Sequence, residues 1–164
     1  MDLIVGSTWI VLSLYSVIAN VSLIVSIGTS ARMRATPSFW IIASHAVCDM
    51  GMSVMAFIHA IPSIFLHELY FTYESLTNVI MLLFYDIFWY TEVVHLSVMA
   101  INRYICIVYP SSYAKCFSWK MTVYILFSSY MLGIAVSLPT QFPCCYTLWD
   151  SYDYFAKYVG AGGW

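Results

Sequence analysis

The sequence YTEVVHLSVMAINRYICIVYP, residues 90–110, is a long apolar segment that carries one acid and ends at a basic residue. Asn102-Arg103-Tyr104 closes the segment, and an apolar turn and Pro110 follow. An arginine at the end of a hydrophobic segment is typical of a residue held at a membrane–water boundary. We therefore expect this stretch to cross a lipid bilayer, and we interpret the rest of the chain relative to that boundary.

The composition of the 164-residue chain is that of a membrane protein. Hydrophobic residues make up 62% and charged residues 9%, against about 45–50% and about 25% in globular chains. Six basic and eight acidic side chains cannot cover a soluble core. The net charge of −2, without a basic run, argues against nucleic acid as a partner. Because the five cysteines show no C-x-x-C spacing, we expect no metal site, and we expect no cofactor.

Four apolar segments are long enough to cross a membrane as helices, since about 20 residues at 1.5 Å each span about 30 Å of hydrocarbon. The first lacks the basic flank of a signal peptide. Residues 111–119 are expected to form a loop. We predict an all-α membrane protein whose single domain covers residues 1–164, with an extracellular loop and tail over 141–164 and spans over about 3–28, 39–65, 76–108 and 120–140.

The basic residues predict the orientation of these spans. If the four spans alternate, five of the six basic residues fall on one side of the membrane, and Lys157 lies on the other. The positive-inside rule makes the basic side cytoplasmic. The N-terminus is then outside, and the residues on the cytoplasmic side are Arg32, Arg34, Arg103, Lys115 and Lys120.

Polar groups inside the spans are candidates for a buried functional core. Asn20, Asp49 and Glu92 are expected near mid-membrane, where charged groups are costly and normally face the bundle interior. They could form one polar core that binds a cation or water, or they could make three unrelated interhelical hydrogen bonds. The histidines of the spans lack the i,i+4 pairing of a metal site, so we interpret them as hydrogen-bonded structural residues.

Several markers together resemble the first half of a rhodopsin-like G-protein-coupled receptor. They are Asn20 in the first span, Asp49 within ASHAVCD in the second, Asn102-Arg103-Tyr104 closing the third with Pro110 after it, and Pro139 near the outer end of the fourth. LFYDI and HLSVMAINRYICIVYPSSYAKCFSWKMT are most similar to the nematode serpentine chemoreceptors, in particular class x. The resemblance covers about residues 5–148.

The resemblance implies a multi-pass chemosensory receptor of the plasma membrane, and not an enzyme. A small extracellular ligand would bind between the outer ends of the helices, and a heterotrimeric G protein would bind at the cytoplasmic face. Asn102, Arg103, Tyr104 and Pro110 would couple to the G protein. The candidates for the ligand pocket are Tyr85, Asp86 and Trp89, for each of which packing against another helix remains the alternative.

The sequence departs from the family's pattern in three ways. Asn78 stands where most of the superfamily has a cysteine, so the usual disulfide is not expected, and the pairing of Cys144 and Cys145 stays open. Asn102 replaces the usual aspartate, so it can hydrogen-bond but cannot form an ion pair with Arg103. The family has seven spans, so we expect this chain to be a truncated product, a partial gene model or a fragment.

Two other function classes are compatible with the polar residues. A four-helix transporter or channel subunit could use Asp49, Asp86 and Glu92 as a path for protons or cations, although no internal repeat supports it. An intramembrane enzyme could use His95 with Glu92, although no nucleophile accompanies the pair. The ligand, the G-protein class and the cell type are not determined by the sequence.

Overall fold

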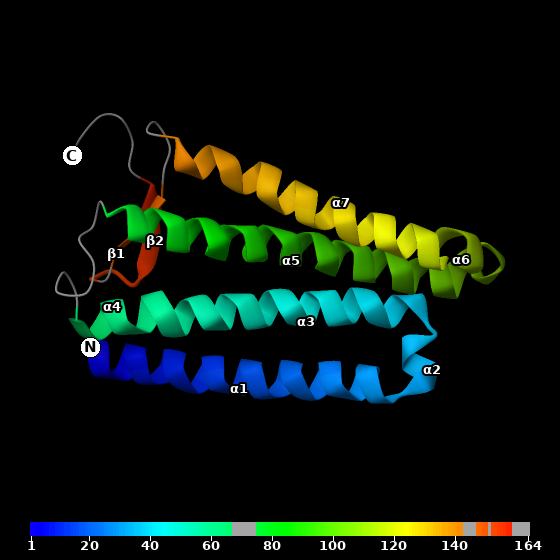
Figure 1. The fold of residues 1–164 in the computed structure, drawn as a ribbon, viewed down its shortest axis with the longest axis horizontal. Helices are drawn as coiled ribbons and strands as arrows, with labels where there is room; N and C mark the ends of the chain where they lie inside the picture. Colours follow the sequence, from blue (N-terminus) through cyan, green and yellow to red (C-terminus); the bar gives the residue numbers. More distant parts are fainter. Residues whose placement is uncertain (67–74, 143–146, 151, 159–164) are drawn as a thin grey trace.

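The computed structural model describes residues 1–66, 75–142, 147–150 and 152–158. Its main elements are four long helical segments that lie side by side in chain order (Figure 1). The first is α1 (Asp2–Thr29), and the third is α5 (Leu76–Val108). The second consists of α3 (Pro37–Met55), η1 (Ala56–Ala60) and α4 (Ile61–Leu66), and the fourth consists of α7 (Trp119–Ser137) and η3 (Leu138–Gln141).

All four segments are long and apolar enough to cross a membrane. The shortest, Trp119–Thr140, has 22 residues, which correspond to about 33 Å of helix, and it contains an 18-residue stretch with a mean hydropathy of 1.7. The predicted fold class, a helical membrane protein with four spans, is confirmed. In addition the structure contains a short hairpin, β1 (Thr147–Asp150) and β2 (Phe155–Tyr158), within the region expected to be loop and tail.

The second span passes through a π-helical turn before its proline. Pro62 has no backbone N–H and therefore cannot continue the regular i→i−4 hydrogen-bond ladder. At the end of η1 the N–H of Ile61 instead reaches five residues back to the carbonyl of Ala56. This wider turn lets the helix continue through Pro62 to Leu66.

The connections at one end of the bundle are helical. Ser30 caps the single turn α2 (Ala31–Arg34), because its side chain accepts a hydrogen bond from the N–H of Met33. The expectation of a loop over residues 111–119 is wrong for most of that range, since α6 (Pro110–Cys116) is a helix. Pro110 occupies its first turn, where the missing N–H costs nothing and the fixed φ favours a helix start.

The hairpin lies at the opposite end, beside the N-terminus (Figure 1). Its strands pair antiparallel, from Thr147 opposite Tyr158 to Asp150 opposite Phe155. The Asp150 carboxylate accepts hydrogen bonds from the N–H groups of Tyr152 and Asp153 across the turn. Local side-chain bonds of this kind are why aspartate favours turns. The sequence predicts loop and tail for this region.

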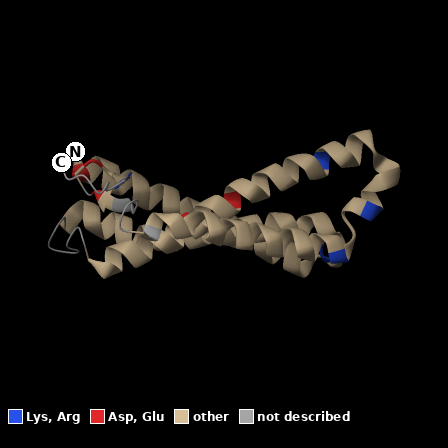
Figure 2. Ribbon diagram, turned by 90° about the horizontal axis from the view of Figure 1, so that it is seen from above, with Lys and Arg blue, Asp and Glu red and all other residues tan. Residues whose placement is uncertain are grey.

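Charges are distributed unequally along the bundle. Figure 2 shows basic residues gathered at the end that carries α2 and α6, whereas acidic residues lie at mid-length and at the hairpin end. Lys157 is in the hairpin, where its ammonium bonds to the carboxylates of Asp150 (2.6 Å) and Asp153. This distribution agrees with the positive-inside argument that places the α2 and α6 end in the cytoplasm.

Candidate functional site

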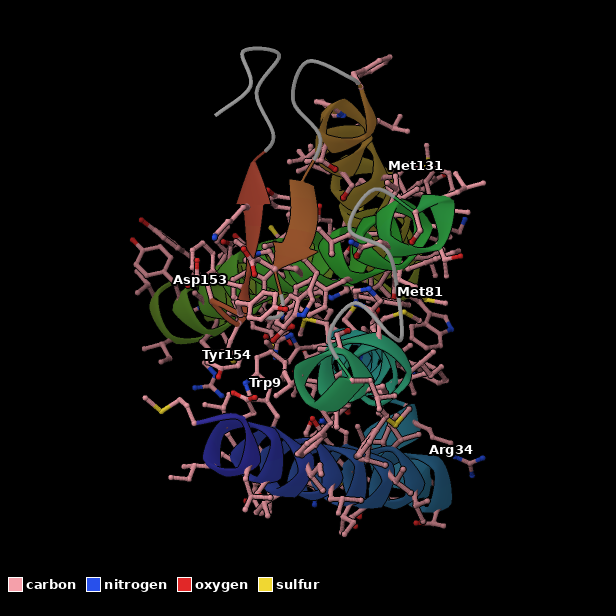
Figure 3. All side chains as sticks on the ribbon, turned by 90° about the vertical axis from the view of Figure 1, so that its left-hand side faces the viewer. Trp9, Arg34, Met81, Met131, Asp153 and Tyr154 are labelled. Carbon is pink, nitrogen blue, oxygen red and sulfur yellow. The ribbon has the colours of Figure 1, made fainter. Side chains whose placement is uncertain are left out.

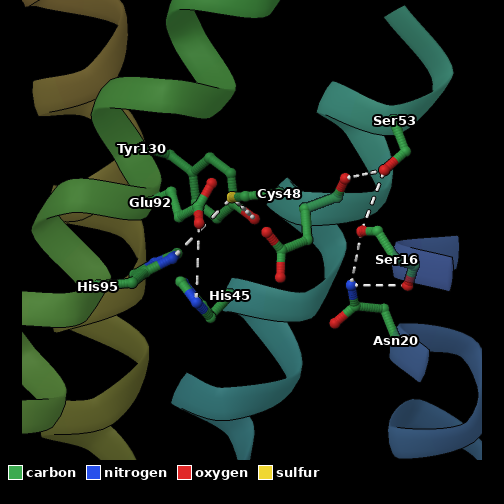
Figure 4. A network of polar contacts seen from close by, with 9 residues as sticks. Ser16, Asn20, His45, Cys48, Ser53, Glu92, His95 and Tyr130 are labelled. Atoms are coloured by element: carbon green, nitrogen blue, oxygen red, sulfur yellow. Dashed lines mark hydrogen bonds and ion pairs between the residues drawn. The ribbon is translucent and has the colours of Figure 1, made fainter. Parts of the chain in front are cut away.

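The middle of the bundle brings together one imidazole and two carboxylates. His45 and Asp49 are four residues apart on α3 and therefore lie on one face of that helix. Glu92 extends toward them from α5, with its Oε1 atom 3.8 Å from Nε2 of His45 (Figure 4). One ligand atom from each of the three residues lies within 4.8 Å of the others. Asp49 and Glu92 were predicted members of a polar core, whereas His45 was missed, although its i,i+4 spacing from Asp49 was a usable signal.

Asn20 belongs to the same network but does not reach the carboxylates directly. Its side-chain amide donates to the carbonyl (2.9 Å) and hydroxyl (3.2 Å) oxygens of Ser16. The Ser53 hydroxyl donates to the backbone carbonyl of Asp49 at 2.9 Å, and its oxygen lies within hydrogen-bond distance, 3.1 Å, of the Ser16 hydroxyl. Asn20 therefore ties α1 to α3 through two serines, as Figure 4 shows.

A second group of polar side chains lies beside this cluster, on the adjacent face of α3. Nδ1 of His95, which is fully buried on α5, lies 3.9 Å from the Sγ atom of Cys48. Tyr130 of α7 contacts Cys48 at 3.6 Å and Ser44 at 3.1 Å, and its ring meets the His95 ring edge-on at 5.6 Å. Because Glu92 pairs with His45, the arrangement does not present the Glu92–His95 pair that an intramembrane enzyme would have used.

The cluster of His45, Asp49 and Glu92 has the donor set of a cation site. Two carboxylates in an apolar span need a proton or a cation to remain there, and imidazole and carboxylate groups are both metal ligands. Among the described residues, Nδ1 of His45 and Oε2 of Glu92 are buried without a hydrogen-bond partner. The arrangement could therefore bind water, a proton or a cation, and the expected absence of a metal site stays a prediction.

The end of α5 beside α6, which the sequence predicts to be cytoplasmic, carries Asn102 and Arg103. The Asn102 amide donates to the hydroxyls of Ser38 (3.1 Å) and Tyr113 (3.4 Å), which also bond to each other. Asn102 therefore joins α5 to the start of α3 and to α6. The side chains of Arg103 and Tyr104 are exposed at this end, and Arg103 borders a small cavity of about 140 Å³.

The half of α5 nearer the hairpin, which the sequence predicts to be the outer one, carries the three predicted pocket residues. The rings of Tyr85 and Trp89 stack, with centroids 6.4 Å apart and an angle of 11° between their planes. Tyr85 lines an outer cavity of about 250 Å³, and both rings line a neighbouring hollow of about 270 Å³ along α1 and α3. The Asp86 carboxylate lines neither of these; it accepts a hydrogen bond from Thr140, 3.2 Å away at the outer end of the fourth span.

The hairpin covers the 250 Å³ cavity. Trp149 meets the ring of Trp9 of α1 edge-on at 5.8 Å, and the Tyr154 hydroxyl donates to the Asp2 carboxylate at 2.5 Å. Figure 3, seen from this end, shows Trp9 and Tyr154 near each other between α1 and the hairpin. The hydrogen bond to Asp2 raises the pKa of Tyr154, because it stabilises the protonated phenol. The hairpin is thus attached to the first helix.

At the hairpin end of α5, Asn78 stands where the resemblance to the receptor family implies a cysteine. Asn78 is 2% exposed and is hydrogen-bonded to the side chain of His59. The free cysteines of the described part are Cys48, Cys106 and Cys116. Cys144 and Cys145, whose pairing the sequence left open, lie outside the described residues.

Comparison with known proteins identifies what this arrangement resembles. Residues 10–160 match the family of serpentine-type seven-transmembrane G-protein-coupled chemoreceptors called Srx. The chain is also 24% identical over 137 residues to the human olfactory receptor 1B1. That alignment covers 82% of this chain and 42% of the olfactory receptor. The chain therefore spans less than half the length of this relative.

Proposed function

The chain belongs to the Srx family of serpentine seven-transmembrane G-protein-coupled chemoreceptors, and we propose that it senses an extracellular chemical at its outer end and passes the signal to a G protein through Arg103. It is a multi-pass membrane protein of a receptor family, not of an enzyme family. In this proposal it lies in the plasma membrane, with the hairpin outside and with α2 and α6 in the cytoplasm. The proposal applies to the complete receptor, in which all seven helices are present.

One observation carries the proposal: a single helix connects the outer cavity, the mid-membrane cluster and the cytoplasmic arginine. Tyr85, Glu92 and Arg103 all belong to α5. They span 18 residues, or about 27 Å at 1.5 Å per residue. A ligand that shifts or rotates α5 at Tyr85 would move Glu92 against His45 and Asp49, and would move Arg103 at the cytoplasmic face.

In this proposal α5 has two arrangements, which differ in the contacts that it makes in the polar core. The contact between His45 and Glu92 joins α3 to α5 at mid-membrane, and a rearrangement there would change the relative position of the two helices. A ligand that favours one arrangement shifts its population and thus transmits a signal. A cation or proton held by Asp49 and Glu92 would stabilise the arrangement in which the carboxylates are close together.

At the cytoplasmic face Asn102 leaves Arg103 available to a partner. The usual aspartate at this position would pair with the arginine, whereas Asn102 bonds to Ser38 and Tyr113. Arg103 is therefore held by fewer interactions in the resting receptor. We infer that basal signalling is higher than it would be with an aspartate at this position.

The test is the substitution Arg103→Ala in the complete receptor. We expect G-protein activation to be lost while the amount at the cell surface stays similar, because Arg103 is exposed and its removal leaves no buried cavity. Arg34→Ala is the matched control, since Arg34 is also exposed and basic at the same end. Undiminished activation by Arg103→Ala, measured as nucleotide exchange on the G protein, would refute the role assigned to this arginine.

Transport is the second function class, and the geometry supports it less well. A cation path would need Asp49, Asp86 and Glu92 in succession. Asp86 is instead bonded to Thr140 and is not among the residues of the mid-membrane cluster. The family is one of receptors, so we retain sensing as the proposed function.

A further inference from the structure

The outer cavity has walls made mainly of aromatic rings. Trp9 of α1, Tyr85 of α5 and three hairpin residues, Trp149, Tyr154 and Phe155, line a space of about 250 Å³. Pockets for drug-sized ligands usually measure about 300–1,000 Å³. The cavity therefore suits a small molecule that is dominated by one ring or a short apolar chain.

The walls of the cavity lack charged side chains among the described residues. Its lining contains aromatic, methionine, leucine and alanine side chains together with His59, and no Asp, Glu, Lys or Arg. The Asp2 carboxylate of α1 accepts the hydrogen bond of Tyr154 and is not among the lining residues. An ionised ligand would lose its hydration here without meeting an opposite charge, which is costly. The ligand that fits is uncharged.

Trp149 adds one polar requirement. Its ring lines the cavity and is held edge-on against Trp9 at 5.8 Å and His59 at 6.4 Å. Its indole N–H is shielded from solvent and has no hydrogen-bond acceptor within the described part of the chain. Tryptophan N–H groups normally find an acceptor when they are buried. A ligand oxygen in the cavity would supply it.

We propose that the outer cavity binds a small uncharged molecule with an apolar ring or chain and one hydrogen-bond acceptor, such as a carbonyl oxygen, which accepts from the indole N–H of Trp149. This inference deepens the proposed sensing function and rests on it for its biological meaning. The binding site itself is built from α1, the second span, α5 and the hairpin.

A second reading of the aromatic walls is a cage for an organic cation. Rings of tryptophan and tyrosine can hold quaternary ammonium groups through cation–π attraction. This ligand would leave the Trp149 N–H without an acceptor and would need a counter-charge that the lining lacks. The test therefore includes such a cation.

Ligand binding is measured on the purified complete receptor in lipid nanodiscs, as a concentration-dependent rise of its unfolding temperature. The two principal probes are acetophenone and ethylbenzene, which share ring and length but differ by a carbonyl oxygen. Benzoate and benzyltrimethylammonium are the charged probes. The quantity compared is the ratio of the two principal affinities in the wild type against the same ratio in each variant, because partitioning of the probes into lipid is the same in all proteins and cancels in that comparison.

We expect the ratio of the acetophenone affinity to the ethylbenzene affinity to be about fivefold higher in the wild type than in Trp149→Phe. A net hydrogen bond is worth about that factor. Trp9→Phe is the matched control: it removes the neighbouring indole of the cavity wall, which packs edge-on against Trp149, and should weaken both principal probes alike. Tighter binding by a charged probe would overturn the inference. So would an unchanged ratio in Trp149→Phe, or no binding of either uncharged probe at millimolar concentration.

These outcomes are separable from the failure of the proposed function. The binding measurement contains no G protein, whereas the Arg103→Ala experiment measures nucleotide exchange. Binding as expected, combined with undiminished activation by Arg103→Ala, would leave the cavity assignment standing and refute only the signalling role of Arg103. The converse result would refute only the ligand class.

Discussion

Replacing Gly133 by alanine tests the helix crossing that sets the position of α5. A Cβ atom at Gly133 would lie 2.1 Å from Oγ1 of Thr91 and 3.1 Å from both the carbonyl oxygen of Ile87 and the N atom of Thr91. Thr91 is fully buried, and β-branched side chains in helices have few alternative rotamers. Helices α5 and α7 would therefore have to separate, and their separation would also displace Glu92, which follows Thr91 in α5.

The magnitude follows from this geometry. Overpacking of a well-packed interior costs about 1–3 kcal/mol, and alanine returns up to about 1 kcal/mol through its higher helix propensity. Taking the middle of the overpacking range, about 2 kcal/mol, less up to about 1 kcal/mol, we expect Gly133→Ala to lower the free energy of unfolding by about 1–2 kcal/mol, or the unfolding midpoint by about 2–8 °C. Thermal unfolding of the complete receptor in nanodiscs measures it.

Two further variants make the Gly133 test specific. Gly28→Ala is the matched control, because a Cβ there meets nothing within 4 Å, so it should leave stability unchanged or raise it slightly. Thr91→Ala should rescue part of the loss in the double variant, since it removes the nearest atom but leaves the two backbone contacts at 3.1 Å. A Gly133→Ala receptor as stable as Gly28→Ala would refute the close crossing, and an additive double variant would refute the role of the Thr91 hydroxyl.

The remaining predictions concern Asn102, the hairpin and the polar core. Asn102→Asp should lower basal nucleotide exchange, because an aspartate can accept from Ser38 and Tyr113 and also pair with Arg103; equal or higher basal exchange would contradict this. At Asp150, burial acts to raise the carboxyl pKa from 3.8, but hydrogen bonds from Lys157 and two backbone N–H groups outweigh it and lower the pKa. Because the folded-state pKa is the lower one, the hairpin gains stability above pH about 4 and loses it as the pH falls through the folded value. The protection of the hairpin amides, measured as their exchange relative to the intrinsic rate at each pH, should therefore fall at low pH in the wild type. It should fall much less in Lys157→Met, whose hairpin is weaker throughout. Glu92→Gln should change ligand-stimulated nucleotide exchange. Asp49→Asn should have a smaller effect in the Glu92→Gln receptor than in the wild type, since the two carboxylates act together. Strictly additive effects of the two substitutions would show that the carboxylates are independent.

The distribution of apolar residues along the sequence determined the four spans. A bilayer interior offers no hydrogen-bond partners, so a long apolar segment has to form a helix that satisfies its own backbone. This constraint is local, and the predicted span over 76–108 corresponds to α5 at Leu76–Val108. The boundary position of Arg103 follows from the same constraint.

The partners of the polar residues were decided only by the tertiary structure. Asp49 and Glu92 are near mid-membrane by their place in the sequence, but the contact of Glu92 with His45 depends on how α3 and α5 rotate against each other. In the same way Asp86 meets Thr140 because α5 crosses the end of the fourth span. Asn102 bonds to Ser38 of α3 and to Tyr113 of α6. The second bond depends on α6, a short helix in a region expected to be loop.

The hairpin shows most clearly the difference between what the sequence determines and what the tertiary structure decides. Its strands are four residues each, too short for periodicity to predict, and it is held by Trp9 and Asp2 from the other end of the sequence. Hydropathy determines which segments enter the membrane, because the solvent acts on each segment separately. The arrangement of the side chains that face one another is decided by packing between segments, and only the folded bundle contains that information.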